Sequence, residues 1–252
     1  MATRFYTDPI NAPDVSPGYG SFWSVPSFYR RKLVIDAAGN NGSTHFTRSE
    51  ALGIALTVGV FQFVSEPLDA ISATLSVSKG AFRCSEDNAK ANASLCVSFR
   101  KCDSDGSNDT EIATIQDGVE FEDGTVGTDD VNRFFGPSDL ANVTLNQGDR
   151  LIVEVGVLFA NTKTTPYEAG MFVTDNHATT DLPENDTETA AYNSWIETGD
   201  TFTVASGGDE ETIIDADSDH KMSGTHPGLK RKLRTAGTSL SHAMSGTHPA
   251  VG

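Results

Sequence analysis

The sequence contains few cysteines and no long apolar run. Cys84, Cys96 and Cys102 form an odd set, which argues against the disulfide framework of a small secreted domain. The longest apolar run, Ile54 to Ser65, is interrupted by Gln62 and is shorter than the roughly 20 residues that span a bilayer. The opening MATRFYTDPINAP also lacks the basic and apolar regions of a secretory signal. We therefore expect a protein made in a reducing cytoplasm, with no membrane partner.

Patterns of the common catalytic and metal sites are absent as well. The chain has no HExxH, GxSxG, P-loop or CxxC pattern, so we expect no enzymatic activity and no cofactor. His242 and His248 lie six residues apart without a cysteine, a spacing unlike that of standard zinc sites. The carboxylates of Glu120, Glu122 and Asp123 are interpreted as part of a solvated acidic loop, because their spacing does not single out a glycosidase pair.

One turn offers the oxygen ligands that a calcium ion prefers. The stretch DSDGSND places Asp103, Asp105 and Asp109 between two expected strands. Gly106 comes too early for an EF-hand loop, and no glutamate follows at the position of the bidentate ligand. An ordinary hairpin turn is the preferred interpretation, with a calcium site as the weaker alternative.

Basic residues are scarce, except near the C-terminal end. The chain holds 18 Lys and Arg against 35 Asp and Glu, for a net charge of −17. A chain this acidic repels nucleic acid, so no nucleic-acid partner is expected. Residues 220–252, in contrast, hold five basic residues and no acidic one, and the acidic stretch 207–219 directly precedes them. This asymmetry predicts that the basic tail pairs with an acidic surface, in the same chain or in a neighbour.

The same basic region contains MSGTHP twice, from Met222 and from Met244. Methionine provides an adaptable apolar contact, glycine permits close backbone approach, and threonine and histidine offer hydrogen bonds. Two tethered copies suit two equivalent sites on a repeating assembly, since tethering raises the effective concentration of the second copy. We therefore predict an anchor that engages a repeated partner twice. Its candidate contact residues are Met222, Thr225, His226, Pro227, Lys230, Arg231, Lys232, Arg234, Met244, Thr247, His248 and Pro249.

Alternation of apolar and polar residues with period two dominates the middle of the chain. It is clear in residues 70–78 and 149–160, and such alternation is typical of half-buried strands. About nine short strands separated by turn signals predict an all-β fold, a jelly-roll-like antiparallel β-sandwich. In residues 56–63 the alternation predicts one side formed by Leu56, Val58, Val60 and Gln62, and the other by Thr57, Gly59, Phe61 and Phe63.

Two stretches are helix candidates. TRSEALGIAL offers Thr47 or Ser49 as an N-cap, and SEDNAKANAS has room for a further helical turn.

Proline and aromatic residues are frequent at the start of the chain. Four prolines within residues 1–50 argue against a helix or a central strand, while the aromatic rings need a surface to pack on. The sequence thus predicts an extended N-terminal arm over residues 1–50 and a β-sandwich domain over residues 51–206. An acidic linker and an extended, basic C-terminal tail would follow over residues 207–252.

Several segments resemble proteins encoded in the structural modules of tailed bacteriophages. They are MATRFYTDPINAPDVSPGYG, CSEDNAKANASLCVSFRK, GDRLIVEVGV and TDLPENDTETAAYNSWIE. The resemblance covers about residues 1–205 and implies a β-sandwich component of a virion, without assigning a role to any residue. The expected partners are then other virion proteins of the capsid, neck or tail, in a homo-oligomer.

Within this class we expect a capsid decoration or head-spike protein held by its C-terminal tail. The alternatives are a tail- or neck-associated virion protein and a module that binds host surface glycans. An exposed Trp or Tyr on a concave face would favour the glycan-binding module.

Overall fold

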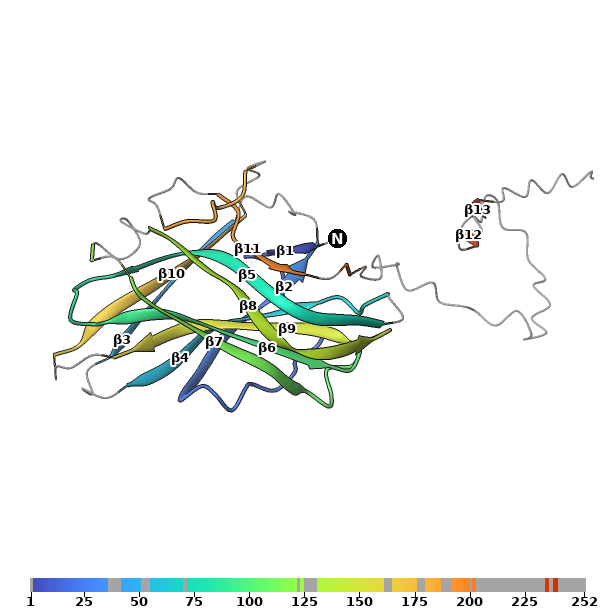
Figure 1. Cartoon of the computed structure of the whole chain (residues 1–252), viewed down its shortest axis with the longest axis horizontal. Coiled ribbons are helices and arrows are strands. Elements are labelled where there is room, and N and C mark those ends of the chain that lie inside the picture. Colours follow the sequence, from blue (N-terminus) through green and yellow to red (C-terminus); the bar gives the residue numbers. More distant parts are fainter. Residues whose placement is uncertain are drawn as a thin grey trace, which may run out of the picture. The chain divides into compact units, whose positions relative to one another are not determined.

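The described part of the chain consists of strands, turns and irregular segments. The computed structural model describes residues 2–35, 42–50, 55–69, 72–121, 123–124, 131–160, 165–175, 180–186, 192–199, 201–202, 234–235 and 238–239. Every regular element within these residues is a β-strand, which confirms the predicted all-β class (Figure 1). The strands are β1 Thr3–Thr7, β2 Val25–Val34, β3 Gly42–Glu50, β4 Leu56–Ser65, β5 Ser72–Glu86, β6 Ala93–Cys102, β7 Thr110–Glu120, β8 Val131–Asn146, β9 Arg150–Phe159, β10 Tyr167–Asp175, β11 Trp195–Thr198, β12 Arg234–Thr235 and β13 Thr238–Ser239.

The chain divides into two compact units. The first, Met1–Asp209, contains β1 to β11, and the second, Glu210–Gly252, contains β12 and β13. In the second unit the two short strands pair antiparallel, with Arg234 opposite Ser239 and Thr235 opposite Thr238.

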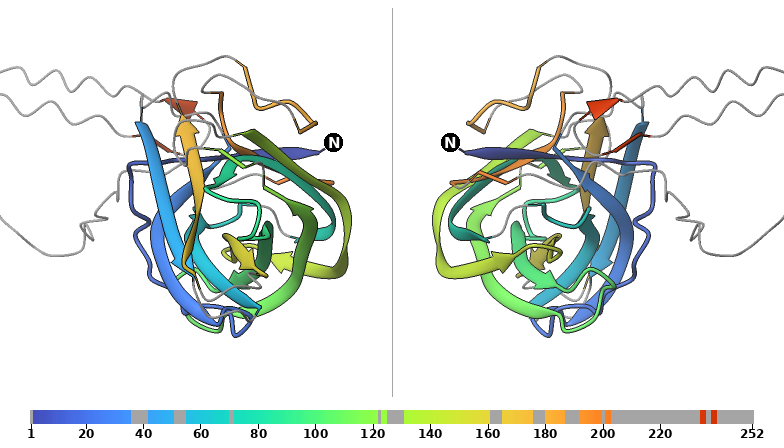
Figure 2. Two further views of the ribbon diagram at one scale, coloured as in Figure 1. Left: turned by 90° about the vertical axis from the view of Figure 1, so that its left-hand side faces the viewer. Right: turned by 90° about the vertical axis from the view of Figure 1, so that its right-hand side faces the viewer.

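One sheet of 11 strands forms the first unit. Its order is β3-β10-β5-β11-β1-β2-β4-β9-β6-β7, with β8 paired to β5. The pairs are antiparallel except for β2 and β4, which run parallel. Seen from the end, the sheet curves around a common interior (Figure 2). The sheet is therefore mixed, and the jelly-roll connectivity stays a prediction.

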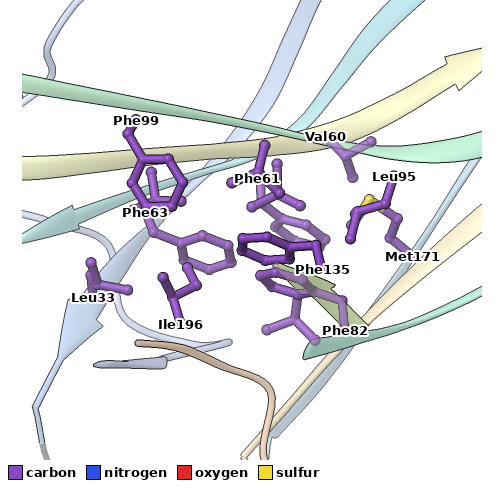
Figure 3. Close-up of a cluster of buried hydrophobic side chains, with 14 of the residues drawn as sticks. Leu33, Val60, Phe61, Phe63, Phe82, Leu95, Phe99, Phe135, Met171 and Ile196 are labelled. Atoms are coloured by element: carbon purple, nitrogen blue, oxygen red, sulfur yellow. The ribbon is translucent and has the colours of Figure 1, made fainter. Parts of the chain in front are cut away.

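The interior is filled by apolar side chains from most of the strands. Phe82 and Phe135 stack with ring centroids 6.5 Å apart, and Phe61 and Phe63 stack at 5.6 Å (Figure 3). The predicted inward face of β9 is confirmed, because its alternating apolar residues all belong to this core: Leu151, Val153, Val155, Val157 and Phe159.

The predicted faces of β4 differ from those in the structure. The pairing of β4 with β9 shifts register between Gly59 and Phe61, which is a β-bulge or a related irregularity. Val60 and Phe61 consequently both lie in the core, as do Val58 and Phe63. A strict alternation cannot anticipate the extra residue that such a shift introduces.

The region predicted as an extended arm, residues 1–50, contributes three strands to the sheet, β1, β2 and β3, and only residues 8–24 between β1 and β2 are described as an extended segment outside it. β1 pairs with β11 and β2, β2 with β4, and β3 with β10, all within the unit Met1–Asp209. Pro9, Pro13 and Pro17 fall between β1 and β2, where no ladder needs their missing amide hydrogens. Pro26 lies at a register shift in β2. Prolines at such places are compatible with a sheet.

The helix predicted around Thr47 and Ser49 is wrong. Both residues lie in β3, where they pair with Gly170 and Glu168 of β10, so tertiary hydrogen bonds override the local preference. In SEDNAKANAS, the amide of Ala91 donates to the carbonyl of Asn88 at 2.8 Å within an isolated turn. Among the described residues, no helix is long and apolar enough to cross a membrane.

Candidate functional site

The predicted anchor falls mainly outside the described residues. Of its candidate contact residues, only the backbone of Arg234 is described, in the short β12–β13 pair. The double engagement of a partner by MSGTHP stays a prediction.

The turn Asp103–Asp109 connects β6 to β7, as expected of a hairpin. The Asp103 carboxylate accepts a hydrogen bond from Asn108 Nδ2 at 2.7 Å. Asp105 Oδ1 accepts one from the Ser107 amide at 2.9 Å and one from the Ser107 hydroxyl at 2.6 Å. These bonds, led by that of the hydroxyl, hold the pKa of Asp105 below its ordinary value.

Asp109, the third candidate calcium ligand, pairs with a buried arginine. Its Oδ1 lies 2.6 Å from Arg100 Nη2. The three carboxylates of the turn are thus engaged with different partners, and in the part of the chain that the structure describes no three Asp, Glu, His or Cys side chains are arranged to hold a metal ion.

Among the described residues, a concentration of buried charge centres on Glu154 of β9. This residue points away from the core-facing side of β9 and is nevertheless 0% exposed. Its Oε1 accepts hydrogen bonds from Arg100 Nη1 and from Gln62 Nε2, each at 2.9 Å. Its Oε2 accepts one from Trp23 Nε1 at 2.8 Å. Buried charges are tolerated when they are paired and hydrogen-bonded in this way.

Residues 8–24, which we call the covering segment, bury this cluster. The carbonyl of Gly18 accepts hydrogen bonds from Arg100 Nη1 and Gln62 Nε2, both at 2.7 Å, and the Gly20 amide donates to Glu154 at 3.1 Å. We call the side chains of Gln62 on β4, Arg100 on β6 and Glu154 on β9 the Glu154 cluster. Their hydrogen bonds fix the covering segment on these three strands.

A second ionic contact holds the covering segment at Asp14. The Asp14 carboxylate receives two hydrogen bonds from the Arg150 guanidinium, each of 2.8 Å. Partial burial of Asp14 opposes ionisation, but the Arg150 hydrogen bonds and charge outweigh it and lower the pKa of Asp14. Arg150 Nε also donates to the carbonyl of Ser104 in the β6–β7 turn at 2.7 Å, so one side chain joins two loops.

The sequence contained a signal for this cluster that pattern analysis did not use. Gln62 and Glu154 are isolated polar residues within otherwise apolar strands, and they pair directly across β4 and β9. Their location in a strand could be predicted, but the covering segment that buries them comes from a distant part of the chain.

Exposed aromatic side chains gather in the N-terminal region. Trp23 and Trp195 are buried, whereas Tyr19 and Tyr29 are 39% and 42% exposed. The Tyr19 ring has the guanidinium of Arg30 4.7 Å from its centroid and the Phe28 ring at 4.9 Å. A sugar would have to share the Tyr19 ring with these neighbours, so the arrangement does not favour a glycan platform.

The three cysteines are buried and form no disulfide bond, as expected for small core residues. Cys96 and Cys102 both lie in β6, and burial raises the pKa of their thiols to about 12 and about 11. Such thiols remain protonated and poorly nucleophilic at neutral pH.

Comparison with known proteins leaves the family undefined. No protein-family model matches the chain, and no curated protein does. An aminopeptidase from the marine sediment archaeon Thaumarchaeota archaeon is similar at 11% identity, over 80% of this chain and 37% of that protein, with a TM-score of 0.46. A CocE/NonD family hydrolase from Staphylococcus aureus is similar at 11% identity, over 80% of this chain and 37% of that protein, with a TM-score of 0.45.

Infectious bursal disease virus of the Gt strain gives a remoter likeness. It is 13% identical over 80% of this chain and 42% of the viral chain, with a TM-score of 0.28. The chain thus spans less than half of each of these proteins, and likenesses of this strength carry no argument about function.

Proposed function

We propose that the protein is a structural component of a tailed-phage virion, a capsid decoration or head-spike protein attached through its C-terminal segment. The observation that carries the proposal is the division of the chain. An all-β unit, Met1–Asp209, precedes a separate unit that contains both copies of MSGTHP. The resemblance of residues 1–205 to phage structural proteins supports the same assignment.

In this proposal the protein works by binding and not by catalysis. Residues 220–252 hold five basic and no acidic residues, while residues 1–219 hold 13 basic and 35 acidic ones. The tail is therefore complementary to acidic neighbours, and each MSGTHP copy would occupy one of two equivalent sites. A shell with many identical sites suits such a duplicated anchor better than a neck or tail, where fewer equivalent sites exist.

The test is a reconstitution on particles that lack this protein. Full-length protein is compared with two full-length variants in which the order of residues 222–227, or of residues 244–249, is shuffled. Shuffling keeps length, composition and charge unchanged, so the three proteins differ only in the motif. Quantitative mass spectrometry counts the bound copies per particle.

We expect each shuffled variant to bind with at least about tenfold weaker apparent affinity, because the second attachment becomes impossible. Equal binding of all three proteins would refute the anchor. Failure of the unaltered protein to bind any particle would refute the virion assignment. The number of copies at saturation distinguishes a shell from a neck or tail location.

A further inference from the structure

β7 and β8 are neighbours that are not joined by a ladder. The two strands are in contact, yet among the described residues their strand pairing is with β6 and β5 only (Figure 1). One hydrogen bond across the contact comes from Arg133 of β8, whose side chain is 2% exposed. Its Nη2 donates to the carbonyl of Glu120 at 2.7 Å, and its Nη1 lies 3.6 Å from the Asp186 carboxylate. We call this contact the β7–β8 seam.

The chain that leaves β7 is attached close to Glu86, the last residue of β5. The Phe121 amide donates to the carbonyl of Ala93 at 2.7 Å, and the Gly124 amide donates to the carbonyl of Glu86 at 2.9 Å. The Glu86 side chain is itself buried, and its Oε2 accepts a hydrogen bond from the Ala93 amide at 2.8 Å. Displacement of this chain would therefore expose Glu86, together with the buried Phe121 ring.

Three carboxylates lie close enough to Glu86 to disfavour its ionisation. Glu120 belongs to β7, Asp123 to the chain that follows it, and Asp87 is the next residue after Glu86. In the described part of the chain, no basic side chain forms an ion pair with Glu86. Burial, with smaller contributions from these three charges, raises the pKa of Glu86 to about 7, against the single Ala93 hydrogen bond.

Asp117, on β7, is a second carboxyl of the same kind. Its Oδ2 is buried and accepts no hydrogen bond. The charged groups that face it are Asp186 and Arg133, which act in opposite directions. Burial is the larger cause, and the pKa of Asp117 is raised to about 6.

We propose that the β7–β8 seam is a pH-dependent closure, which is tight while Glu86 and Asp117 carry protons and loosens when both ionise. Opening exposes each carboxyl to water and separates it from the neighbouring acids, so the open state favours the ionised forms. Both groups bind protons more tightly in the closed state. The equilibrium constant for opening therefore rises with pH, from the ordinary range of carboxyl groups up to about pH 7. The proposal is independent of the virion assignment.

Amide hydrogen exchange of the full-length protein, followed by mass spectrometry, tests the closure. Exchange in residues 110–124 is measured at about pH 5 and about pH 8 and corrected for the intrinsic pH dependence of amide exchange. Glu86→Gln, Asp117→Asn and the double variant imitate the protonated groups. Glu111→Gln is the matched control, because Glu111 is an exposed carboxylate of the same strand.

We expect opening of the unaltered protein to increase about tenfold or more between the two pH values, and each single variant to reduce this increase. The double variant should stay protected at both pH values, while the control should behave as the unaltered protein does. The proposal is overturned if the double variant retains the full pH dependence, if the unaltered protein has none, or if Glu111→Gln removes it equally. If Glu86→Gln does not fold, Asp117→Asn alone must reduce the dependence.

Discussion

At the scale of single residues, the buried Glu154 carboxylate depends on its hydrogen-bond and ion-pair partners for its stability. We expect Glu154→Gln to lower the free energy of unfolding by about 3 kcal/mol, because it removes the buried one of the two carboxylates that pair with buried Arg100. The introduced amide would also direct two N–H donors at groups that are themselves donors. Urea unfolding at neutral pH measures the change.

The control for this substitution is Glu184→Gln. Glu184 pairs with Lys79 at 2.7 Å, but its side chain is 47% exposed, so its loss should cost under about 1 kcal/mol. If both substitutions lowered the free energy of unfolding equally, the buried ion pair of Glu154 would not contribute more to stability than an exposed one.

The sequence correctly predicted the burial of single residues where the face of the strand alone determines it. The apolar residues of β9 face the core, as the alternation indicated. It failed for Ile152 and Glu154 on the opposite face, which are fully buried as well. Their burial depends on the covering segment, whose hydrogen bonds to Glu154 span more than 130 residues of chain. No periodicity within β9 contains that information.

At the scale of elements, the close approach of β4, β9 and the covering segment requires glycine. Gly156 pairs with Gly59, and a Cβ at Gly156 would overlap the carbonyl of Val58 and lie 2.6 Å from the Trp23 ring. We expect Gly156→Ala to destabilise the protein by about 1–3 kcal/mol or more, because neither the strand nor the ring has room to move. Displacement of Trp23 should change the near-ultraviolet circular dichroism.

Gly118→Ala is the control variant, because it introduces backbone strain without the steric overlap expected for Gly156→Ala. Gly118 has a φ of +75°, which disfavours alanine, but a Cβ there meets nothing within 4 Å. It should cost about 1–2 kcal/mol and leave the tryptophan spectrum unchanged. An unchanged near-ultraviolet spectrum for Gly156→Ala would show that β4, β9 and the covering segment can accommodate the added methyl group without displacing Trp23.

Elements were predictable where pairing and local preference agree. The segments that became β4, β5 and β9 were expected as strands. β1, β2 and β3 were not, since prolines and a helix-like pattern concealed them. Their strand state comes from partners elsewhere in the chain, as when β3 pairs along its whole length with β10. Local sequence cannot report a partner more than 100 residues away.

At the scale of the whole molecule, the chain divides into two compact units, Met1–Asp209 and Glu210–Gly252. We expect a chain ending at Asp209 to unfold in urea with the same free energy as the full-length protein, within about 1 kcal/mol, since the described core residues all lie within Met1–Asp209. A larger loss of stability on truncation would show that residues 210–252 contribute to the sheet. Circular dichroism and tryptophan fluorescence should give coincident transitions for both proteins.

The pairing of β1 with β11 has a consequence for the order of events during synthesis. Thr3 to Tyr6 lie opposite Trp195 to Thr198, so β1 must wait for β11, the last strand of the unit. Contacts of such sequence separation are slow to form, because a long loop closes before any contact rewards it. On the ribosome, β1 is left with an open edge until nearly 200 residues have been translated. We therefore expect the pairing of β1 with β11 to be a late step in the folding of the sheet.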